Sequence, residues 1–414
     1  MASIGALVAL TACGGSKTSN SATVPTTSTA GSAPTSANPP ATGKTIKVGV
    51  LTDVTGLAAS GEAHIEDGVK AGVADAKSQG LTITYVMADS QTSPTAVLSA
   101  AKKLVSQEHV DVVLGASALL FGAAPYLTQQ GVPVVGFPQD GPEWLTAKNM
   151  FSNVGMLDPT KVTTLVGTFF KSLGASNIGS VGYAISPQSA ESAKGAAASA
   201  ESVGLKAGYV NSKFPFGSTD VQPVALAMKS AGIDALAPQV SPNSSFALLT
   251  ALKTQNVNIK AALLPIGYGG DLLTSDAATL KAADGAYFNL PFQPIEMNTP
   301  GTQRFLAALK SVGATQAPGT ATYTGYTAID LLVEGLKNAG GDFSKSGIIN
   351  GLEKVTSWDA NGLLDKPFNP RDPQNVAGPN NCAYFVKLAG GRFVTVSNAD
   401  PVCGSVVAGK TVSP

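Results

Sequence analysis

Few side chains of this chain could carry out covalent or metal chemistry. Three cysteines, Cys13, Cys382 and Cys403, and two histidines, His64 and His109, occur among 414 residues. A metal site needs several such ligands at close spacing, and a nucleophilic triad needs a histidine base oriented by a third group. Neither pattern is found, because one histidine falls in an expected helix and the other directly before an expected strand. No Ser-elbow or phosphate-loop motif is present either. We therefore expect no enzyme activity, no metal and no cofactor.

Two cysteines near the C-terminus suggest a disulfide. Outside the cytoplasm, Cys382 and Cys403 are expected to pair. The bond would close a loop of roughly 20 residues, worth about 3 kcal/mol if unstrained. Metal binding by this pair is the alternative, but both histidines lie far away in the sequence.

The third cysteine follows a short apolar run. Residues 4–10 are apolar or small, and Leu10, Thr11 and Ala12 directly precede Cys13. This arrangement resembles the lipobox of bacterial lipoproteins, in which the cysteine is acylated and becomes the first residue of the mature protein. The resemblance implies a signal peptide over residues 1–12 and a lipid on Cys13. The run contains no Lys or Arg, so the usual basic n-region is missing, and an ordinary cysteine is the alternative.

Composition separates a tether from a folded body. Residues 13–43 are dominated by Ser, Thr, Ala, Pro and Gly, with Lys17 as the one charge, so we expect a disordered tether. The whole chain balances 27 basic against 27 acidic residues, which gives nucleic-acid binding no electrostatic support. No later apolar stretch reaches the ~20 residues that a membrane span needs.

From Lys44 onward, short apolar strands alternate with amphipathic helices. Strands are expected over residues 46–51, 82–87, 110–115, 132–137, 178–185, 206–211, 235–240, 260–265 and 285–290. Helices are expected from residue 65, from Pro94 with Ser93 as N-cap, and over residues 160–173, 187–203, 220–231, 243–256 and 323–339. Residues 382–388 and 393–396 are typical of a β-hairpin. The alternation predicts an α/β protein with two doubly wound, mostly parallel sheets.

Four segments carry a family resemblance. They are residues 46–56 (IKVGVLTDVTG), residues 89–96 (DSQTSPTA) leading to 100–105 (AAKKLV), residues 110–115 (VDVVLG) with 131–138 (GVPVVGFP), and residues 323–340 (YTGYTAIDLLVEGLKNAG). In this order, behind a lipobox, they resemble type 1 periplasmic binding proteins of the Leu/Ile/Val-binding branch, which feed ABC importers. The resemblance covers roughly residues 44–400.

The resemblance implies two α/β lobes joined by a three-segment hinge. By analogy, the first lobe comprises residues 44–157 plus 290–357, and the second comprises residues 158–289 plus 358–414. Ligand would bind in the cleft between the lobes, beyond the carboxyl ends of the strands. Closure around ligand would be a hinge motion.

The expected ligand loops depart from those of amino-acid binders. Such relatives hold the ligand carboxylate with hydroxyl residues of the first lobe and the ammonium with an acid of the second. Here residues 115–121 (GASALLF) keep Ser117 alone, and Asp140 in the next loop would repel a carboxylate. Ile266 falls near the place of the second-lobe acid, although Asp271 is close by. The departures put branched-chain amino acids in doubt.

The candidate ligand contacts come from these loops and from loops after later strands. They are Ser117, Ala118, Leu119, Phe121, Gln139, Asp140, Ser186, Gln188, Ser241, Ile266 and Tyr268. Phe216 and Asn243 are further candidates. Helix packing beneath the cleft is the alternative for residues 119–121. A solvated loop position or an N-cap is the alternative for Asp140, and a helix cap for Ser241 or Asn243.

The resemblance implies a lipid-anchored, monomeric solute-binding protein on the extracytoplasmic face of the cell membrane. It would deliver a small molecule to ABC permease subunits. The pocket favours a larger or less polar ligand, such as an aromatic acid, an amide, or a lipid-like or sterol-derived molecule. If the ligand has an amine, Asp140 is the first candidate partner. A sensory receptor of the same fold is the alternative function.

Overall fold

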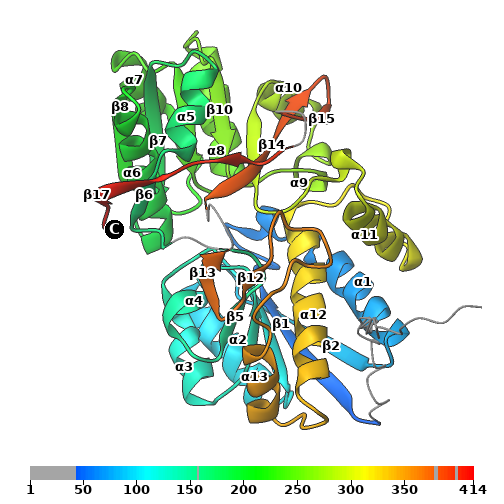
Figure 1. Cartoon of the computed structure of the whole chain (residues 1–414). Helices are drawn as coiled ribbons and strands as arrows, with labels where there is room; N and C mark the ends of the chain where they lie inside the picture. The colour runs from blue at the N-terminus through cyan, green and yellow to red at the C-terminus, as the bar shows by residue number, and fades with distance from the viewer. Residues whose placement is uncertain (1–42, 156–157, 377–380, 397–399) are drawn as a thin grey trace, which may run out of the picture. The chain divides into compact units, whose positions relative to one another are not determined.

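The computed structural model describes residues 43–155, 158–376, 381–396 and 400–414. The predicted signal peptide, Cys13 and almost all of the predicted tether lie outside the described residues. Figure 1 shows the described chain as β-sheets covered by helices. The predicted α/β class with parallel-sheet cores is confirmed.

The first sheet consists of five parallel strands in the order β2-β1-β3-β4-β5. They are β1 (Thr45–Thr52), β2 (Thr82–Asp89), β3 (Val112–Ala116), β4 (Val134–Gly136) and β5 (Met150–Ser152). On β1, Val48 and Val50 join a hydrophobic cluster with α1 and α12, whereas Leu51 joins a second cluster with α2. Because both faces are covered, the strands read as continuous apolar runs in the sequence.

Helices cover this sheet on both faces. They are α1 (Ile65–Ser78), α2 (Pro94–Ser106), α3 (Ala124–Gln129), α4 (Glu143–Thr146), α12 (Thr320–Asn338) and α13 (Lys345–Glu353), with the short η1 (Ala59–Gly61) and η2 (Leu120–Gly122) in loops. Ser93 caps α2 as predicted, since its Oγ accepts from the Ala96 amide at 3.5 Å. Helices α1 and α12 pack so closely that a Cβ on Gly68 would lie 1.9 Å from the Thr322 carbonyl oxygen. Glycine at this position permits that contact.

The second sheet combines parallel and antiparallel pairing. Strands β8-β7-β9-β10-β11 are parallel, and β14 and β15 extend the sheet in antiparallel fashion, with β16 also pairing with β14. The strands are β7 (Asn177–Tyr183), β8 (Lys206–Phe214), β9 (Ala235–Gln239), β10 (Ala261–Leu264), β11 (Tyr287–Leu290), β14 (Cys382–Ala389), β15 (Arg392–Thr395) and β16 (Val402–Cys403). The predicted hairpin is confirmed, because β14 and β15 pair up to Ala389 and Arg392.

Helices also cover both faces of the second sheet. They are α5 (Leu165–Ser172), α6 (Pro187–Ser202), α7 (Gln222–Ser230), α8 (Pro242–Thr254), α9 (Gly270–Leu273) and α10 (Ala277–Ala283). Phe169 of α5 and Ala196 of α6 pack in one cluster with Ile178 of β7, whereas Met228 of α7 and Leu252 of α8 belong to another. The alternation of side chains along each strand separates these two clusters.

One predicted helix is shorter than expected. The sequence predicts a helix over residues 160–173, but Lys161–Thr163 form the strand β6, and α5 begins at Leu165. Strand β6 pairs antiparallel with β17 (Val406–Thr411) near the C-terminus. The β-branched residues Val162 and Thr163 suit a strand. Their partner strand β17 lies more than 240 residues further along the chain, so the local sequence does not reveal the pairing.

The order of the described elements takes the chain three times from one sheet to the other. The passages follow β5, follow β11, and precede β14. After β11 come η3 (Ile295–Met297) and α11 (Pro300–Ser311), and before β14 come β12 (Phe368–Asn369) and β13 (Asp372–Val376). Trp358 and Asn361 donate to the carboxyl group of Asp330 on α12, at 3.1 and 2.7 Å. Hinge motion and the lobe boundaries stay predictions.

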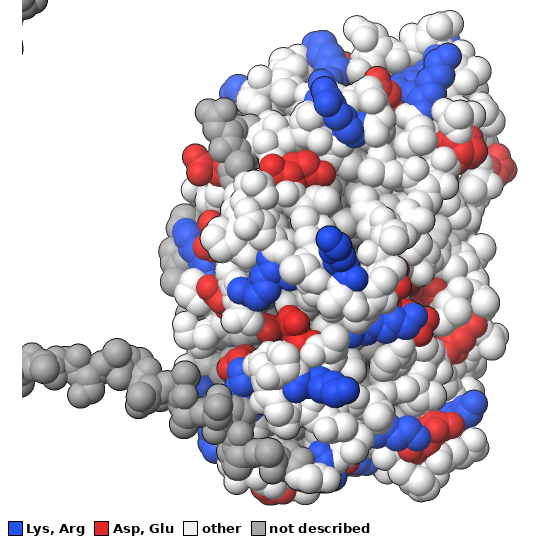
Figure 2. Space-filling model, turned by 90° about the vertical axis from the view of Figure 1, so that its right-hand side faces the viewer, with Lys and Arg blue, Asp and Glu red and all other residues white. Residues whose placement is uncertain are grey.

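The charged surface is mixed. In the face shown in Figure 2, basic and acidic side chains are interspersed among wide uncharged areas. That face offers no block of like charge to a polyanion. Among the described residues, no helix is both long enough and apolar enough to cross a membrane.

Candidate ligand-binding site

A cavity of about 400 Å³ lies at the carboxyl ends of strands from both sheets. This volume is within the range of small-molecule sites. Its wall is formed by residues 58, 61 and 62 after β1, residue 118 after β3, and residues 137–139 after β4. From the second sheet come residues that end or follow β7, β9, β10 and β11. Parallel strands leave their loops at one edge of a sheet, which is where open α/β sheets bind ligands.

Much of the wall is apolar. The apolar residues are Ala58, Ala118, Phe137, Pro138, Val154, Leu165, Phe216, Val240, Pro242, Pro265, Ile266, Pro291 and Ala383. Tyr183 adds a third aromatic ring, which lies 4.5 Å from that of Phe216, measured between ring centroids. Aromatic faces of this kind suit a ligand with rings or an extended apolar surface.

Several hydroxyl groups of the wall are engaged within the protein. The Tyr183 hydroxyl bonds the Ser241 hydroxyl at 2.7 Å and accepts from the Ser241 amide at 3.0 Å. Ser186 caps α6, because its Oγ accepts from the Ser189 amide at 3.2 Å. These contacts fix the amino ends of α6 and α8 beside the cavity.

Glu62, Gln139 and Gln188 form the polar centre of the wall. The Gln139 side-chain amide donates to Glu62 Oε1 at 2.9 Å, and the Gln188 side-chain amide donates to the Pro138 carbonyl oxygen at 3.0 Å. The other oxygens, Oε2 of Glu62 and Oε1 of Gln188, are shielded from solvent and have no hydrogen-bond partner within the described chain. Among the described residues, these two polar atoms of the wall are therefore without hydrogen-bond partners.

The surroundings of Glu62 are acidic. Burial raises the pKa of this carboxyl group well above its usual range, and the charges of Asp53 and Asp271 raise it further. The hydrogen bond from Gln139 opposes that shift. Burial also raises the pKa of Asp271 to about 8 and raises the pKa of Asp53. Among the described residues that line the cavity, none is Lys or Arg.

Asp53 occupies the donors of the loop after β3. Ser117 Oγ donates to Asp53 Oδ1 at 2.7 Å, and the Ala118 amide donates to Asp53 Oδ2 at 2.8 Å. Ser90 Oγ also donates to Asp53. The hydroxyl group that the sequence offered as an anion contact thus already binds an internal carboxyl group.

The structure brings some predicted residues to the cavity and leaves others outside it. Ala118, Gln139, Ser186, Gln188, Ser241 and Ile266 line the cavity, as does Phe216. Ser117, Leu119, Phe121, Asp140 and Tyr268 do not. Contact between the lining residues and a ligand stays a prediction.

Asp140, a candidate ligand contact, is engaged within the protein. Its side chain is fully buried, and its carboxyl group accepts from the Phe121 amide at 2.6 Å and from the Trp144 indole at 3.2 Å. Burial and the neighbouring Glu143 raise its pKa well above the usual range. Asp140 therefore holds the segments after β3 and β4 together.

Tyr268 and Leu119 are also structural. The Tyr268 hydroxyl donates to Glu296 Oε2 at 2.6 Å and accepts from the Ile295 amide at 3.1 Å, which places it in the core rather than in the wall. Leu119 is buried, in agreement with the alternative of packing beneath the cleft.

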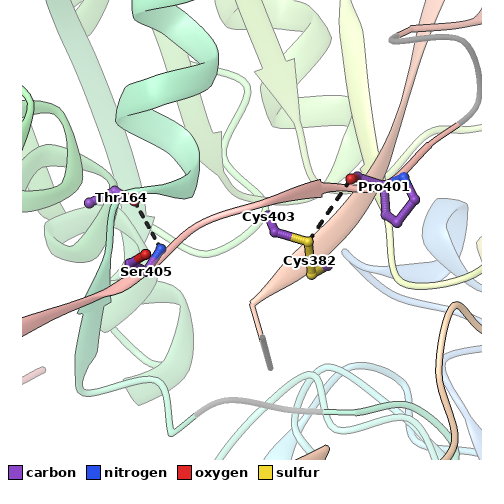
Figure 3. The surroundings of a disulfide bond; sticks show 5 residues. All are labelled: Thr164, Cys382, Pro401, Cys403 and Ser405. Atoms are coloured by element: carbon purple, nitrogen blue, oxygen red, sulfur yellow. Dashed lines mark hydrogen bonds between the residues drawn. A yellow bond between two sulfur atoms is a disulfide. The ribbon is translucent and has the colours of Figure 1, made fainter. Parts of the chain in front are cut away.

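The predicted disulfide is present, and one of its residues lines the cavity. Figure 3 shows the bond between Cys382 of β14 and Cys403 of β16. Nearby, the Ser405 amide donates to Thr164 Oγ1 at 3.0 Å. The bond joins the C-terminal segment to the edge of the cavity, because Cys382 and Asn381 belong to the wall. No group of three or more metal-ligating side chains occurs in the described ranges.

Reasoning from the sequence missed Glu62, Gln239 and Asn289. The last two end or nearly end β9 and β11, so the carboxyl-end rule could have identified them. Glu62 follows the short η1, and no sequence pattern indicates that its side chain meets Gln139, 77 residues further along the chain.

Comparison with known proteins agrees with this architecture. The family model for periplasmic binding proteins matches residues 45–392. Because this match covers most of the chain, the chain belongs to the periplasmic binding protein family. No curated protein sequence matches the chain. It is a solute-binding protein rather than an enzyme, and such a protein acts outside the cytoplasm.

Solved structures of similar fold include an ABC transporter solute-binding protein from R. palustris in complex with benzoate. Its TM-score is 0.72 at 19% identity, over 87% of this chain and 98% of that one. A leucine-binding protein from Thermotoga maritima MSB8 has a TM-score of 0.70 at 17% identity, and the match covers 85% of this chain and 98% of that one. A second R. palustris solute-binding protein, in complex with 4-hydroxybenzoate, has a TM-score of 0.71 at 17% identity, and the match covers 87% of this chain and 97% of that one. At these identities the likeness shows the type 1 fold that the sequence motifs predicted.

Proposed function

We propose that this chain is the lipid-anchored solute-binding subunit of an ABC importer. It captures a small molecule in the cavity at the carboxyl ends of the two sheets and delivers it to the permease. The observation that carries the proposal is a cavity of about 400 Å³ whose wall combines loops of both sheets. The bond from Gln188 to the Pro138 carbonyl oxygen joins these two sides, and the proposed hinge movement would have to break it to open the cavity.

The proposed ligand is larger or less polar than a branched-chain amino acid. Phe137, Phe216, Ile266 and several prolines give the wall an extended apolar surface. The hydroxyl loop expected to hold an amino-acid carboxylate is bonded to Asp53. Similar solved structures hold benzoate and 4-hydroxybenzoate, which supports a ligand with an aromatic ring.

The anchor rests on the lipobox around Cys13 and on the tether of residues 13–43. A lipid on this cysteine would hold a single copy of the protein at the extracytoplasmic face of the membrane, within reach of the permease.

A binding screen followed by uptake measurements tests the proposal. Purified full-length protein carrying Cys13→Ser is screened by thermal shift against amino acids, amides, aromatic acids, amines and sterol-derived acids. A ligand at ~100 times its Kd adds about 2.7 kcal/mol of stability. Uptake of the hit is then compared in cells with and without the gene. Loss of uptake supports an importer, whereas binding with unchanged uptake favours a sensory receptor. A hit with Leu, Ile or Val alone would contradict the proposed ligand class.

A further inference from the structure

The polar side chains of the cavity wall indicate which chemical group of a ligand they can bind. Glu62 Oε2 and Gln188 Oε1 are shielded from solvent and have no partner among the described residues. The amide oxygen of Gln188 can only accept a hydrogen bond, so it requires a donor. Both side chains are fixed against the same loop, through Gln139 and Pro138 respectively. One donor group that makes several hydrogen bonds could therefore serve both oxygens.

The charges around the cavity disfavour an anionic ligand. Asp53 and Asp271 act on Glu62, and in the described part of the wall no Lys or Arg offsets these carboxyl groups. The hydroxyl of Ser117 and the amide of Ala118 both donate to Asp53, so they are not available to a second carboxylate. A carboxylate in this cavity would lie close to these carboxyl groups, with no Lys or Arg among the described lining residues, and its charge would oppose their ionisation.

We propose that the ligand carries a protonated amine and no carboxylate, and that Glu62 determines this specificity. The ammonium group donates to the side-chain oxygens of Glu62 and Gln188 after a small turn of both side chains toward the cavity, because Oε2 and Oε1 have almost no accessible surface before the ligand binds. This inference rests on the proposed function and adds the chemistry of the ligand's head group. An ammonium group has three donors and a charge that matches the acidic wall, whereas a hydroxyl group has one donor and no charge.

The remaining wall fits the rest of such a molecule. Phe137 and Phe216 offer aromatic surface to an apolar stem. Asn381, also in the wall, has a solvent-shielded side-chain nitrogen with no acceptor within the described chain. A neutral acceptor on the ligand, such as a carbonyl or ether oxygen, would satisfy it.

The acid–base behaviour of Glu62 agrees with this geometry. Burial, Asp53 and Asp271 all raise its pKa, so the carboxyl group resists ionisation without a positive partner. An ammonium ligand favours the ionised form. Asp53 and Asp271 also have raised pKa values. As the pH rises, both carboxyl groups become negatively charged, which attracts an ammonium group. Affinity for an amine should therefore increase from pH 5 to pH 8, below the ordinary amine pKa of about 10.

Three probes of matched size test the head group. Phenethylamine, phenethyl alcohol and phenylacetate are titrated into full-length protein carrying Cys13→Ser, with heat as the readout. We expect the amine to bind at least tenfold more tightly than the alcohol, and the acid to bind most weakly. The amine affinity should rise with pH, while the alcohol affinity stays constant.

Variants assign the preference to Glu62. Glu62→Gln keeps the shape of the side chain and an acceptor for Gln139, and should lower amine affinity at least tenfold with little effect on the alcohol. Glu201→Gln, on the exposed far end of α6, is the matched control and should change neither affinity. Asp53→Asn removes a nearby charge and should weaken the amine while strengthening the acid. The melting temperature of each unliganded variant reports folding.

The outcomes separate the inference from the proposed function. Tighter binding of the acid, or an amine preference that survives Glu62→Gln and is constant with pH, would overturn the inference. If none of the three probes binds but another compound from the screen does, the inference fails and the proposed function stands. If no compound of the whole screen binds, the proposed function fails as well.

Discussion

Replacing Asp271 by asparagine should stabilise the protein at neutral and alkaline pH. The carboxyl group of Asp271 accepts from the Thr320 amide at 3.2 Å, at the amino end of α12, and its Oδ1 has no partner among the described residues. Burial raises its pKa from 3.8 to about 8. Between these values the unfolded chain is ionised at this position and the folded chain is protonated, so the stability of the folded state falls as the pH rises.

The magnitude follows from the pKa difference. About four pKa units at ~1.4 kcal/mol each give an upper bound of about 6 kcal/mol for the cost of ionising Asp271 above pH 8. At pH 7 the bound is about 4 kcal/mol. The helix dipole of α12 favours a negative charge at this end and reduces the cost by about 1 kcal/mol. Asparagine keeps an oxygen for the Thr320 amide and removes the titration.

Thermal unfolding as a function of pH measures this effect. The melting temperatures of the wild type and Asp271→Asn should be similar near pH 4 and should diverge up to pH 8, by at least about 4 °C in favour of the variant. Asp276→Asn is the control of opposite sign. Asp276 caps α10, and hydrogen bonds from Thr279 lower its pKa, so the variant should lose stability above pH 4. A difference between the wild type and Asp271→Asn that does not change with pH would refute the reasoning.

Three further predictions concern the cavity, the disulfide and the anchor. A Cβ on Gly61 would lie 3.7 Å from Ile266 and 3.9 Å from Pro242, in ordinary contact. Gly61→Trp should therefore fill the cavity and weaken the best ligand about 100-fold by calorimetry, which is about 2.7 kcal/mol, while Gly61→Ala still binds. Cys382→Ser should lower stability by about 3 kcal/mol in denaturant unfolding, and a reductant should have the same effect on the wild type; equal stability would contradict this. Cys13→Ser should move the protein from the membrane fraction to the soluble fraction on immunoblots, and unchanged membrane association would contradict the lipid anchor.

The parallel core could be predicted because its strands are covered on both faces. Residues 46–51 and 110–115 are continuous apolar runs, and the helices between strands have an apolar side at helical spacing. The cap of α2 was visible as Ser93 followed by Pro94. In each case the signal lies within a few residues of the element that it specifies.

The cavity wall could be predicted only in part, because it depends on contacts between distant segments. The resemblance to known binding loops indicated Gln139 and Ile266 as candidate contacts, the carboxyl-end rule indicated Gln188, and all three line the cavity. Neither argument could show that Asp140 turns inward to Trp144, or that Tyr268 reaches Glu296. The direction of a loop side chain depends on partners that the local sequence does not contain.

A crystal structure of the complex with the best ligand of the screen tests the central claim most directly. We expect one molecule per chain in the cavity, in contact with Ala118 and Gln139 on one side and with Ser186 and Gln188 on the other. Ligand bound elsewhere on the chain, with these side chains free of it, would contradict the claim.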